Sequence, residues 1–177
     1  MIWRAFQRSS PPSLNEASWW RDAQAAADSP SADAVRALRQ SMVTAAQSPD
    51  EAEREEEMID GLEQLLALAG GALPILETQH RVIGADVCHL AVPCGLAGDV
   101  ETPGKLFLTS ARLIFSGGRV QAWPWHRVRQ VVRAERALLF AIAGAPDEIQ
   151  INCNTYGDAL VAVYLTGRLR TSAASRS

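Results

Sequence analysis

A single stretch, Gly104–Val128, decides the fold, and its sequence is GKLFLTSARLIFSGGRVQAWPWHRV. Apolar residues alternate over 105–109 and again over 112–115, and this period of two is typical of β-strands. The residues between these runs form a tight reversal. The Gly117-Gly118 pair supplies the next turn, because glycine takes positive φ without a Cβ penalty. A third run ends at Pro124, whose missing N–H stops a strand or confines it to a sheet edge.

This stretch resembles the core of a GRAM domain or of a bacterial pleckstrin-homology-like domain. There a G-x-L-x-L-T-x-x-R-L-I-F hairpin precedes a strand and an (I/W)-P-W-x-x-(I/V) bend. The matching positions here are Gly104, Leu106, Leu108, Thr109, Arg112, Leu113, Ile114, Phe115, Trp123, Pro124, Trp125 and Val128. The resemblance covers about Gln79 to Arg170. It implies an α+β fold: a half-open barrel made of two orthogonal sheets, with a helix closing one end.

The flanking sequence continues this pattern. Further strands are predicted over residues 82–92, 128–133, 137–143 and 148–153, which brings the total to about seven antiparallel strands. Pro93–Pro103 reads as a loop. Thr155, with Asp158 three residues later, caps a final helix that runs to about Arg170, where Arg168 and Arg170 suit its carboxyl end. We expect one shared core from Leu113, Phe140, Ile149, Ile151 and Leu160.

Three helices are predicted ahead of the strands, over residues 13–27, 32–47 and 49–69. The clearest start is Ser48-Pro49-Asp50-Glu51, with serine at the N-cap, proline at the first helical position and an acid at N3. The first turns of this third helix are almost all acidic, which predicts a solvated acidic face rather than a metal site.

The chain therefore divides into a helical extension at 13–78 and a GRAM/PH-like domain at 79–170, with disordered tails at 1–12 and 171–177. We expect the extension to pack on the domain as a cap, since residues 73–76 lead on without a linker composition.

Composition indicates a globular chain. Of 177 residues, 47% are hydrophobic and 21% are charged. No apolar run reaches the roughly 18 to 20 residues that span a bilayer, and the amino terminus lacks the features of a secretory signal. We expect a soluble, cytoplasmic protein. The single lysine, Lys105, beside 16 arginines and abundant alanine suggests a bacterial, GC-rich genome.

Charge divides along the chain. Residues 1–79 carry 6 arginines and 13 acids, a net −7, whereas residues 80–177 carry 11 basic and 7 acidic residues, a net +4. The acidic half could pack on the basic half, or the two faces could be unrelated. The three cysteines, Cys88, Cys94 and Cys153, include no C-x-x-C pair, which argues against a disulfide or zinc framework.

Signatures of enzymes are absent. The sequence has no P-loop, no G-x-G-x-x-G, no H-E-x-x-H and no G-x-S-x-G. His80, His89 and His126 match no evident nucleophile or metal partner. We therefore expect no catalytic residue, no metal and no cofactor.

The resemblance also bears on lipid binding. In many pleckstrin-homology domains a basic cluster beside the first inter-strand loop grips phosphoinositide headgroups. The matching loop here, Pro93–Pro103, carries Asp99 and Glu101 and neither lysine nor arginine. This charge argues against headgroup recognition by that route.

Two functions remain open. The favoured one is a non-enzymatic interaction or assembly module that binds a protein partner through the barrel and its helical extension, with homo-oligomers possible. The alternative is a peripheral membrane adaptor that uses arginine-bearing strands and tryptophans at the interface. Nucleic acid is not expected at a pI near 5.6. The candidate binding residues are Trp19, Trp20, Trp123, Trp125, Arg127, Arg129 and Arg133.

Two of these candidate sets have alternative interpretations. Trp19 and Trp20 point about 100° apart on a helix, so either one is buried and the other partly covered, or they contribute to a docking surface. Arg129 and Arg133 share one strand phase. These two arginines either face a membrane or pair with the acidic third helix.

Overall fold

The computed structural model describes residues 14–45, 48–78 and 80–175. Three helices come first: α1 (Leu14–Asp28), α2 (Ala32–Ala45) and α3 (Pro49–Leu68). Seven strands follow: β1 (Cys88–Leu96), β2 (Thr102–Thr109), β3 (Arg112–Ser116), β4 (Val120–Pro124), β5 (Val128–Ala134), β6 (Ala137–Ile142) and β7 (Ile149–Cys153). A short 3-10 helix, η1 (Trp125–Arg127), joins β4 to β5, and α4 (Tyr156–Ala174) closes the chain.

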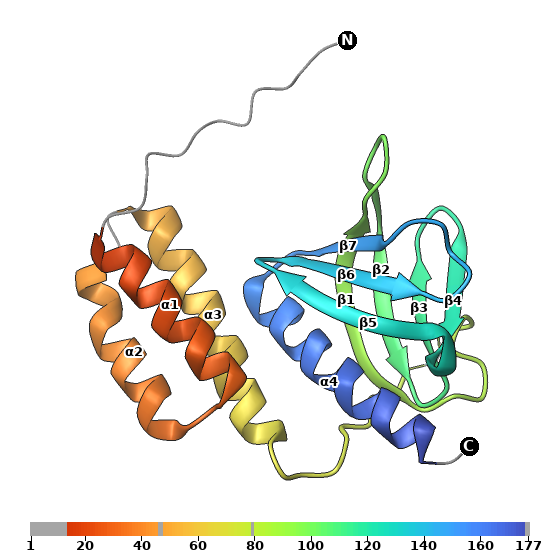
Figure 1. The fold of residues 1–177 in the computed structure, drawn as a ribbon, viewed down its shortest axis with the longest axis horizontal. Helices are drawn as coiled ribbons and strands as arrows, with labels where there is room; N and C mark the ends of the chain where they lie inside the picture. The colour runs from red at the N-terminus through yellow and green to blue at the C-terminus, as the bar shows by residue number, and fades with distance from the viewer. Residues whose placement is uncertain (1–13, 46–47, 79, 176–177) are drawn as a thin grey trace.

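The strands form one open antiparallel sheet in the order β4-β3-β2-β1-β7-β6-β5. The sheet curves strongly, and α4 lies along its open side, between the strands and helices α1 to α3 (Figure 1). Seven antiparallel strands followed by a closing helix agree with the pleckstrin-homology-like architecture that the resemblance implied, although the strands form one continuous curved sheet rather than two separate orthogonal sheets. The predicted α+β fold class is therefore confirmed.

One hydrophobic core runs through the barrel and the helices. Leu113, Phe140, Ile151 and Leu160 are buried in it, and Ile149 packs against it, so the predicted shared core is confirmed. The same cluster includes Met58 and Leu62 of α3. Helices and strands thus bury their apolar faces against one another.

Two strand boundaries differ from the prediction. Residues 81–86 form turns, and the first strand begins at Cys88. Within the predicted loop Pro93–Pro103, β1 continues to Leu96 and β2 starts at Thr102, which leaves only residues 97–101 as loop. Proline fits in β1 because Pro93 pairs with Lys105 of β2 and lies just outside the segment, Cys94–Leu96, where β1 also pairs with β7.

The helix starts follow their sequence signals. Ser48 caps α3 in a reciprocal capping box with Glu51, and the Thr155 hydroxyl accepts the Asp158 N–H at the start of α4. Both predicted caps are confirmed. The predicted tail 1–12, the cap at Ser13 and the last two residues of the chain lie outside the described residues.

The last helix differs from its prediction at the carboxyl end. α4 continues to Ala174, through four residues expected in the disordered tail. The Arg168 side chain does not cap the carboxyl end of α4. Its guanidinium donates to the carbonyls of Leu68 (3.1 Å) and Gly71 (2.8 Å), so it caps the end of α3 instead.

Polar contacts join the helical extension to the barrel. Glu57 Oε2 lies 2.9 Å from Arg136 Nη2 and accepts the Tyr156 N–H at 3.1 Å. The Arg136 guanidinium lies 5.0 Å from the centre of the Tyr156 ring. The Trp20 ring also packs against the Tyr156 ring, with 5.0 Å between the two ring centroids. The extension is therefore packed on the domain.

The acidic face of α3 is solvated only in part. Glu53 and Glu56 are exposed, whereas Glu55 is fully buried, which the sequence interpretation did not anticipate. Within the described ranges, no three histidine, cysteine, aspartate or glutamate side chains gather closely enough to hold a metal ion. No helix in this part of the chain is long and apolar enough to cross a bilayer.

Candidate functional site: a cationic groove beside α4

The turn between β2 and β3 is built around the hydroxyl of Thr109. Its Oγ1 accepts the N–H groups of Ala111 (3.3 Å) and Arg112 (3.0 Å) and lies 2.9 Å from the Arg112 carbonyl oxygen. One buried hydroxyl thus bonds to main-chain groups of two residues in the reversal. This explains the threonine and arginine of the T-x-x-R signature as structural residues.

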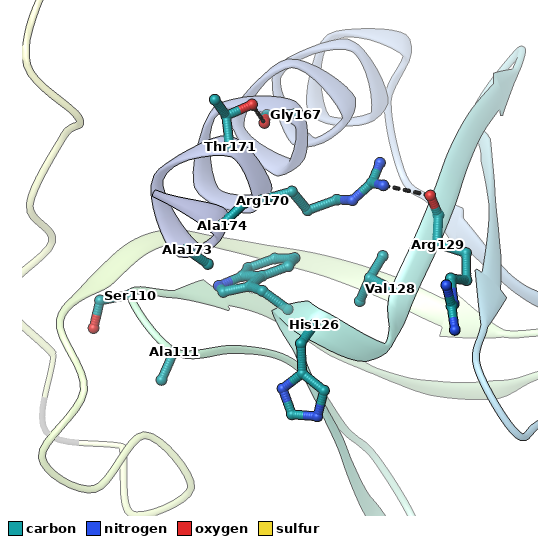
Figure 2. A pocket seen from close by; sticks show the side chains of 11 residues that line it. Ser110, Ala111, His126, Val128, Arg129, Gly167, Arg170, Thr171, Ala173 and Ala174 are labelled. Atoms are coloured by element: carbon teal, nitrogen blue, oxygen red, sulfur yellow. Dashed lines mark hydrogen bonds between the residues drawn. The ribbon is translucent and has the colours of Figure 1, made fainter. Parts of the chain in front are cut away.

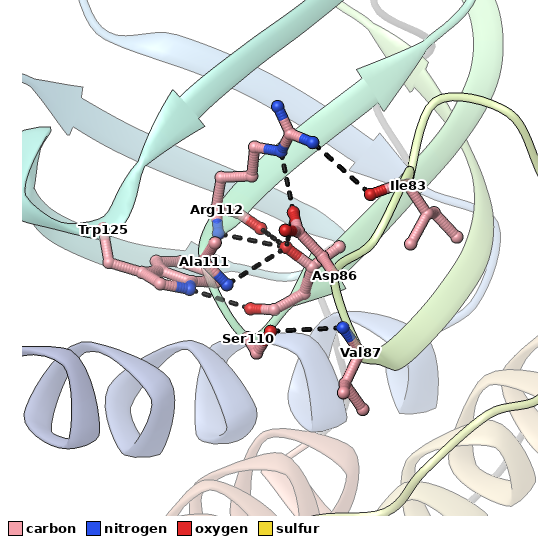
Figure 3. A network of polar contacts seen from close by, with 8 residues as sticks. Ile83, Asp86, Val87, Ser110, Ala111, Arg112 and Trp125 are labelled. Atoms are coloured by element: carbon pink, nitrogen blue, oxygen red, sulfur yellow. Dashed lines mark hydrogen bonds and ion pairs between the residues drawn. The ribbon is translucent and has the colours of Figure 1, made fainter.

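The segment before β1 is fastened to this turn. Asp86 Oδ2 lies 2.8 Å from Arg112 Nε and 3.1 Å from Thr109 Oγ1. Ser110 exchanges two hydrogen bonds with Val87: its N–H donates to the Val87 carbonyl at 2.8 Å, and its hydroxyl accepts the Val87 N–H at 3.2 Å. The position of the turn is therefore fixed from both sides (Figure 3).

The W-P-W bend packs on the same turn. Trp125 is only 3% exposed, and its Nε1–H donates to the Thr109 carbonyl at 2.8 Å. Pro124 precedes it and ends β4. On the far side of the bend, Arg127 donates through Nε (3.0 Å) and Nη2 (2.6 Å) to the Ala143 carbonyl. The bend is thereby held in a single orientation.

Between this assembly and the carboxyl half of α4 lies a groove of about 960 Å³. Its lining residues are Ser110, Ala111, Trp125, His126, Val128, Arg129, Gly167, Arg170, Thr171, Ala173 and Ala174. The turn and the bend form one wall, and α4 forms the other (Figure 2). We call this site the α4 groove.

Small residues on α4 leave this space open. At Gly167 an added Cβ would meet no heavy atom within 4 Å. Arg170 extends from the helix towards β5, where its Nη2 donates to the carbonyl oxygen of Arg129, while the His126 ring points away from α4 (Figure 2). The ionisable residues of the described lining are His126, Arg129 and Arg170, and this lining includes no acid. Of these three, Arg170 lies along the groove, whereas the His126 ring and the Arg129 side chain point away from α4 (Figure 2). An anionic group entering the groove would therefore meet Arg170.

A second hollow, of about 620 Å³, adjoins the α4 groove and shares Ser110 and Thr171 with it. Its lining includes Leu73, Ile75, Val87 and Leu169. Ile75 is 73% exposed and Val87 is 41% exposed, so both aliphatic side chains present apolar surface to solvent. An apolar surface thus continues the cationic groove around the end of α4.

The predicted tryptophans are largely core residues. Trp19 is 3% exposed and its Nε1–H donates to the Leu38 carbonyl, while Trp20 is half-buried against Tyr156. Trp123 is 8% exposed in the barrel core. Of the four, Trp125 lines the groove.

The predicted arginines lie in three different places. Arg127 braces the bend, and Arg129 lines the α4 groove. Arg133 donates to Gln24 of α1, and burial lowers the pKa of its guanidinium. Arg136, rather than the predicted stripe of Arg129 and Arg133, forms an ion pair with an acid of α3.

Sequence reasoning missed the helical wall of the groove. Gly167, Arg170, Thr171 and Ala174 follow one another at helical spacings of three, one and three residues, so they share one face of a helix. That pattern was readable, but the last two positions fell in the predicted tail. Ser110 and Ala111 carried no functional signal, because a turn residue lines a groove only once a distant helix is placed beside it.

The two cysteines on neighbouring strands are inert in this setting. Cys94 of β1 pairs directly with Cys153 of β7, and both are free and buried. Burial raises the pKa of each thiol to about 12. Thiolates are the reactive form of cysteine, so this pair does not offer a nucleophile near neutral pH.

No family model matches the chain, and no curated protein matches it in sequence. Similar solved structures exist at low identity. The C-terminal domain of an unknown protein from Leishmania infantum has a TM-score of 0.44 and 13% identity, covering 50% of this chain and 89% of that one.

Two further similar structures are larger fragments. The DH/PH domain of human ARHGEF11, solved with human RhoA and its inhibitor, has a TM-score of 0.44 and 12% identity over 86% of this chain and 54% of that chain. A truncated linker-DH/PH fragment of p115-RhoGEF has a TM-score of 0.41 and 14% identity over 76% of this chain and 52% of that chain. The chain thus spans about half the length of these DH/PH fragments.

Proposed function

We propose that this chain is a non-enzymatic interaction module of the GRAM-like kind, which binds a protein partner over the carboxyl half of α4. The observation that carries the proposal is the α4 groove itself: a concave site with cationic groups at its rim and an exposed apolar surface beside it. Interfaces of proteins commonly combine an apolar centre with a polar rim.

The packing of the molecule supports a preformed site. The turn at Thr109, the bend at Trp125 and helix α4 are each fixed by buried hydrogen bonds or core packing. Binding of a partner would therefore cost little conformational entropy, because the walls of the groove are already ordered. The cytoplasmic location and the bacterial origin suggested by composition remain part of this proposal.

The membrane-adaptor alternative has less support. Interfacial tryptophans insert because their rings are exposed at the headgroup level, and Trp123 and Trp125 are 8% and 3% exposed. The exposed tip of the first inter-strand loop carries Asp99. These features disfavour contact with an anionic surface.

The test fills the groove without touching the core. Gly167→Trp places an indole where an added Cβ meets open space, and Ala67→Trp makes the same change on an exposed position of α3. Each tagged protein, including the wild type, is used to capture partners from lysate of the organism that encodes it, with quantitative mass spectrometry. We expect proteins captured by the wild type and by Ala67→Trp to be lost with Gly167→Trp. Equal capture by all three folded proteins would refute the proposal.

A further inference from the structure

Two buried cysteines lie opposite each other where β1 pairs with β7. Cys94 of β1 is the direct partner of Cys153 of β7, and each residue is 4% exposed in the main core. Residues directly opposite on antiparallel strands project from the same face of a sheet. The two thiols therefore extend into the core from neighbouring positions.

The main-chain bonds around Cys153 identify the kind of pair. Its N–H donates to the Arg136 carbonyl at 2.8 Å, so its main chain is directed towards the start of β6 and away from β1. Farther along, the Ala97 N–H donates to the Gln150 carbonyl at 3.0 Å, which agrees with this alternation. Cys94 and Cys153 thus form a non-hydrogen-bonded pair, in which Cα atoms are about 4.5 Å apart. Disulfides join Cα atoms about 4.4–6.8 Å apart, so this pair is within bridging reach.

The cysteine pair lies at the end of the shortest strand pairing in the sheet. Cys94–Leu96 is the part of β1 that pairs with β7, whereas β1 pairs with β2 from Cys88 to Leu96. This β1–β7 seam joins β4-β3-β2-β1 to β7-β6-β5. Within the described residues, the part of β1 before Cys94 has no partner in β7. The end of a ladder opens at a lower free energy than its interior, so the cysteine pair lies where the seam opens most readily.

We propose that Cys94 and Cys153 are a redox-sensitive lock: exchange with a small-molecule disulfide, such as oxidised glutathione, joins them across the β1–β7 seam. The thiolate of one cysteine attacks a sulfur of oxidised glutathione and displaces a glutathione thiolate. The other cysteine then attacks the protein sulfur of this mixed disulfide and displaces the second glutathione. One S–S bond replaces two protein S–H bonds, the released glutathione takes up the two protons, and the glutathione disulfide is reduced.

Burial of the thiols determines when this exchange occurs. In the closed fold both thiols are protonated near neutral pH, because burial raises the pKa of each to about 12. Opening of the seam brings them into contact with solvent and reagent, and there the reactive thiolate forms. Exchange is therefore slow in the closed fold and faster under conditions that open the seam. Once formed, the bond closes the long loop between the two cysteines and holds β7, with α4 directly after it, against β1.

The third cysteine provides an internal control. Cys88 packs in a separate cluster with Phe107 and Ile114. The full-length protein is incubated without oxygen in glutathione buffers of rising disulfide content, with and without urea below the unfolding transition. Acid quenching, alkylation of free thiols and peptide mass mapping then identify the bonded cysteines. We expect a Cys94–Cys153 disulfide in the wild type and in Cys88→Ala, formed faster in urea and reversed by dithiothreitol.

The single variant Cys94→Ala separates the lock from general oxidation of thiols. With its partner removed, Cys153 should form only a mixed disulfide with glutathione. Glutathione adducts alone in the wild type, or a disulfide that includes Cys88, would overturn the proposal. Three free thiols at every buffer ratio, with and without urea, would also overturn it.

Two further measurements test whether the bond locks the seam. The oxidised protein should unfold at a urea concentration about 1 M or more above that of the reduced protein. The Ala97 amide, which bonds across the seam, should exchange with deuterium about tenfold more slowly or less. The Val35 amide, which donates to the Ser31 carbonyl at the start of α2, should exchange at the same rate in both states.

The double variant Cys94→Ala/Cys153→Ala is the control for these measurements, and glutathione treatment should change neither its urea midpoint nor its Ala97 exchange. A Cys94–Cys153 bond that leaves both quantities of the wild type unchanged would refute the lock. Equal slowing of the Ala97 and Val35 amides would also refute it, because the bond would then stabilise the whole chain rather than the seam.

Discussion

Gly61 of α3 and Gly157 of α4 lie against each other where the two helices cross. A Cβ added to Gly61 would lie 2.6 Å from the Gly157 Cα, and one added to Gly157 would lie 2.9 Å from the Glu57 carbonyl oxygen. Both neighbours are backbone atoms, which cannot rotate away. Glycine at these two positions therefore sets how closely the helical extension approaches the barrel.

The first prediction follows from this crossing. Gly61→Ala should lower the free energy of unfolding by about 1–3 kcal/mol, because the helices must separate to admit the methyl group. Gly167→Ala is the matched control: it sits in open space on α4 and should raise stability by about 0.5–1 kcal/mol through helix propensity. Urea denaturation measures both. A Gly61→Ala protein as stable as the wild type would contradict the close contact.

The second prediction concerns Glu57 and Arg136. Their double-mutant cycle, with Glu57→Gln and Arg136→Gln, should give a coupling energy of about 0.5–1.5 kcal/mol, since the pair is half-buried and Glu57 also accepts the Tyr156 N–H. The exposed pair Asp33 and Arg36 is the control and should couple by less than about 0.5 kcal/mol. Indistinguishable coupling in the two cycles would mean that Glu57 does not join α3 to the barrel.

The third prediction tests the turn that holds the groove wall. Thr109→Val keeps the shape of the side chain but removes the acceptor of the Ala111 and Arg112 N–H groups, which should cost about 1–3 kcal/mol. Thr171→Val, on the exposed face of α4, should change stability by less than about 0.5 kcal/mol. Thermal unfolding with circular dichroism compares them. If the two substitutions lowered the melting temperature equally, the Thr109 hydroxyl would not stabilise the turn.

The fourth prediction concerns pH. Cys94 and Cys153 have ordinary thiol pKa values of 9.0 when unfolded, and burial raises both to about 12 in the folded chain. The folded state keeps protons that the unfolded state loses, so this stabilisation is complete below pH 9 and declines as pH rises towards 12. Each thiol contributes a slope of about 1.4 kcal/mol per pH unit in that window.

The Cys94→Ala/Cys153→Ala double variant isolates this effect from other groups that titrate at high pH. Under reducing conditions, denaturation between about pH 8 and about pH 10.5 should show a shallower loss of stability for the variant than for the wild type. The same slope for both proteins would mean that the thiols ionise freely in the fold.

The fifth prediction concerns membranes. We expect no co-sedimentation with phosphoinositide vesicles at physiological salt, because the first inter-strand loop has acids and no cation, and salt screens scattered charges within about 8 Å. Deleting the helices would expose Met58 and Leu62 of the core, so neutralising the exposed acids is the better variant. Glu53→Gln, Glu56→Gln, Asp60→Gln and Glu63→Gln together serve this purpose.

Binding that appears only in this neutralised variant would show that α3 repels anionic surfaces electrostatically. Salt-sensitive binding by the wild type would replace the protein-binding proposal with the membrane adaptor.

Local signals in the sequence predicted the order of the helices and strands, whereas the family resemblance supplied their expected arrangement. The alternation around Leu106 and Leu113, the turn residues and the caps at Ser48 and Thr155 depend on neighbours within a few positions, so each could be interpreted in isolation. Pro93 shows the limit of this approach: proline signals a break, yet its acceptability in β1 depends on which edge of that strand is paired, and β7 comes some sixty residues later.

The candidate site depended on tertiary structure instead. The α4 groove combines Ser110, Trp125 and Gly167, which are far apart in the chain and carry no shared motif. Likewise, composition indicated that charge was unevenly distributed, but only the docking of α3 selected Arg136 rather than Arg129 as its partner. Backbone preferences act between residues that are near in sequence. The close approach of Gly61 to Gly157, in contrast, determines how whole helices pack. A groove forms only between packed elements, so it depends on this tertiary packing.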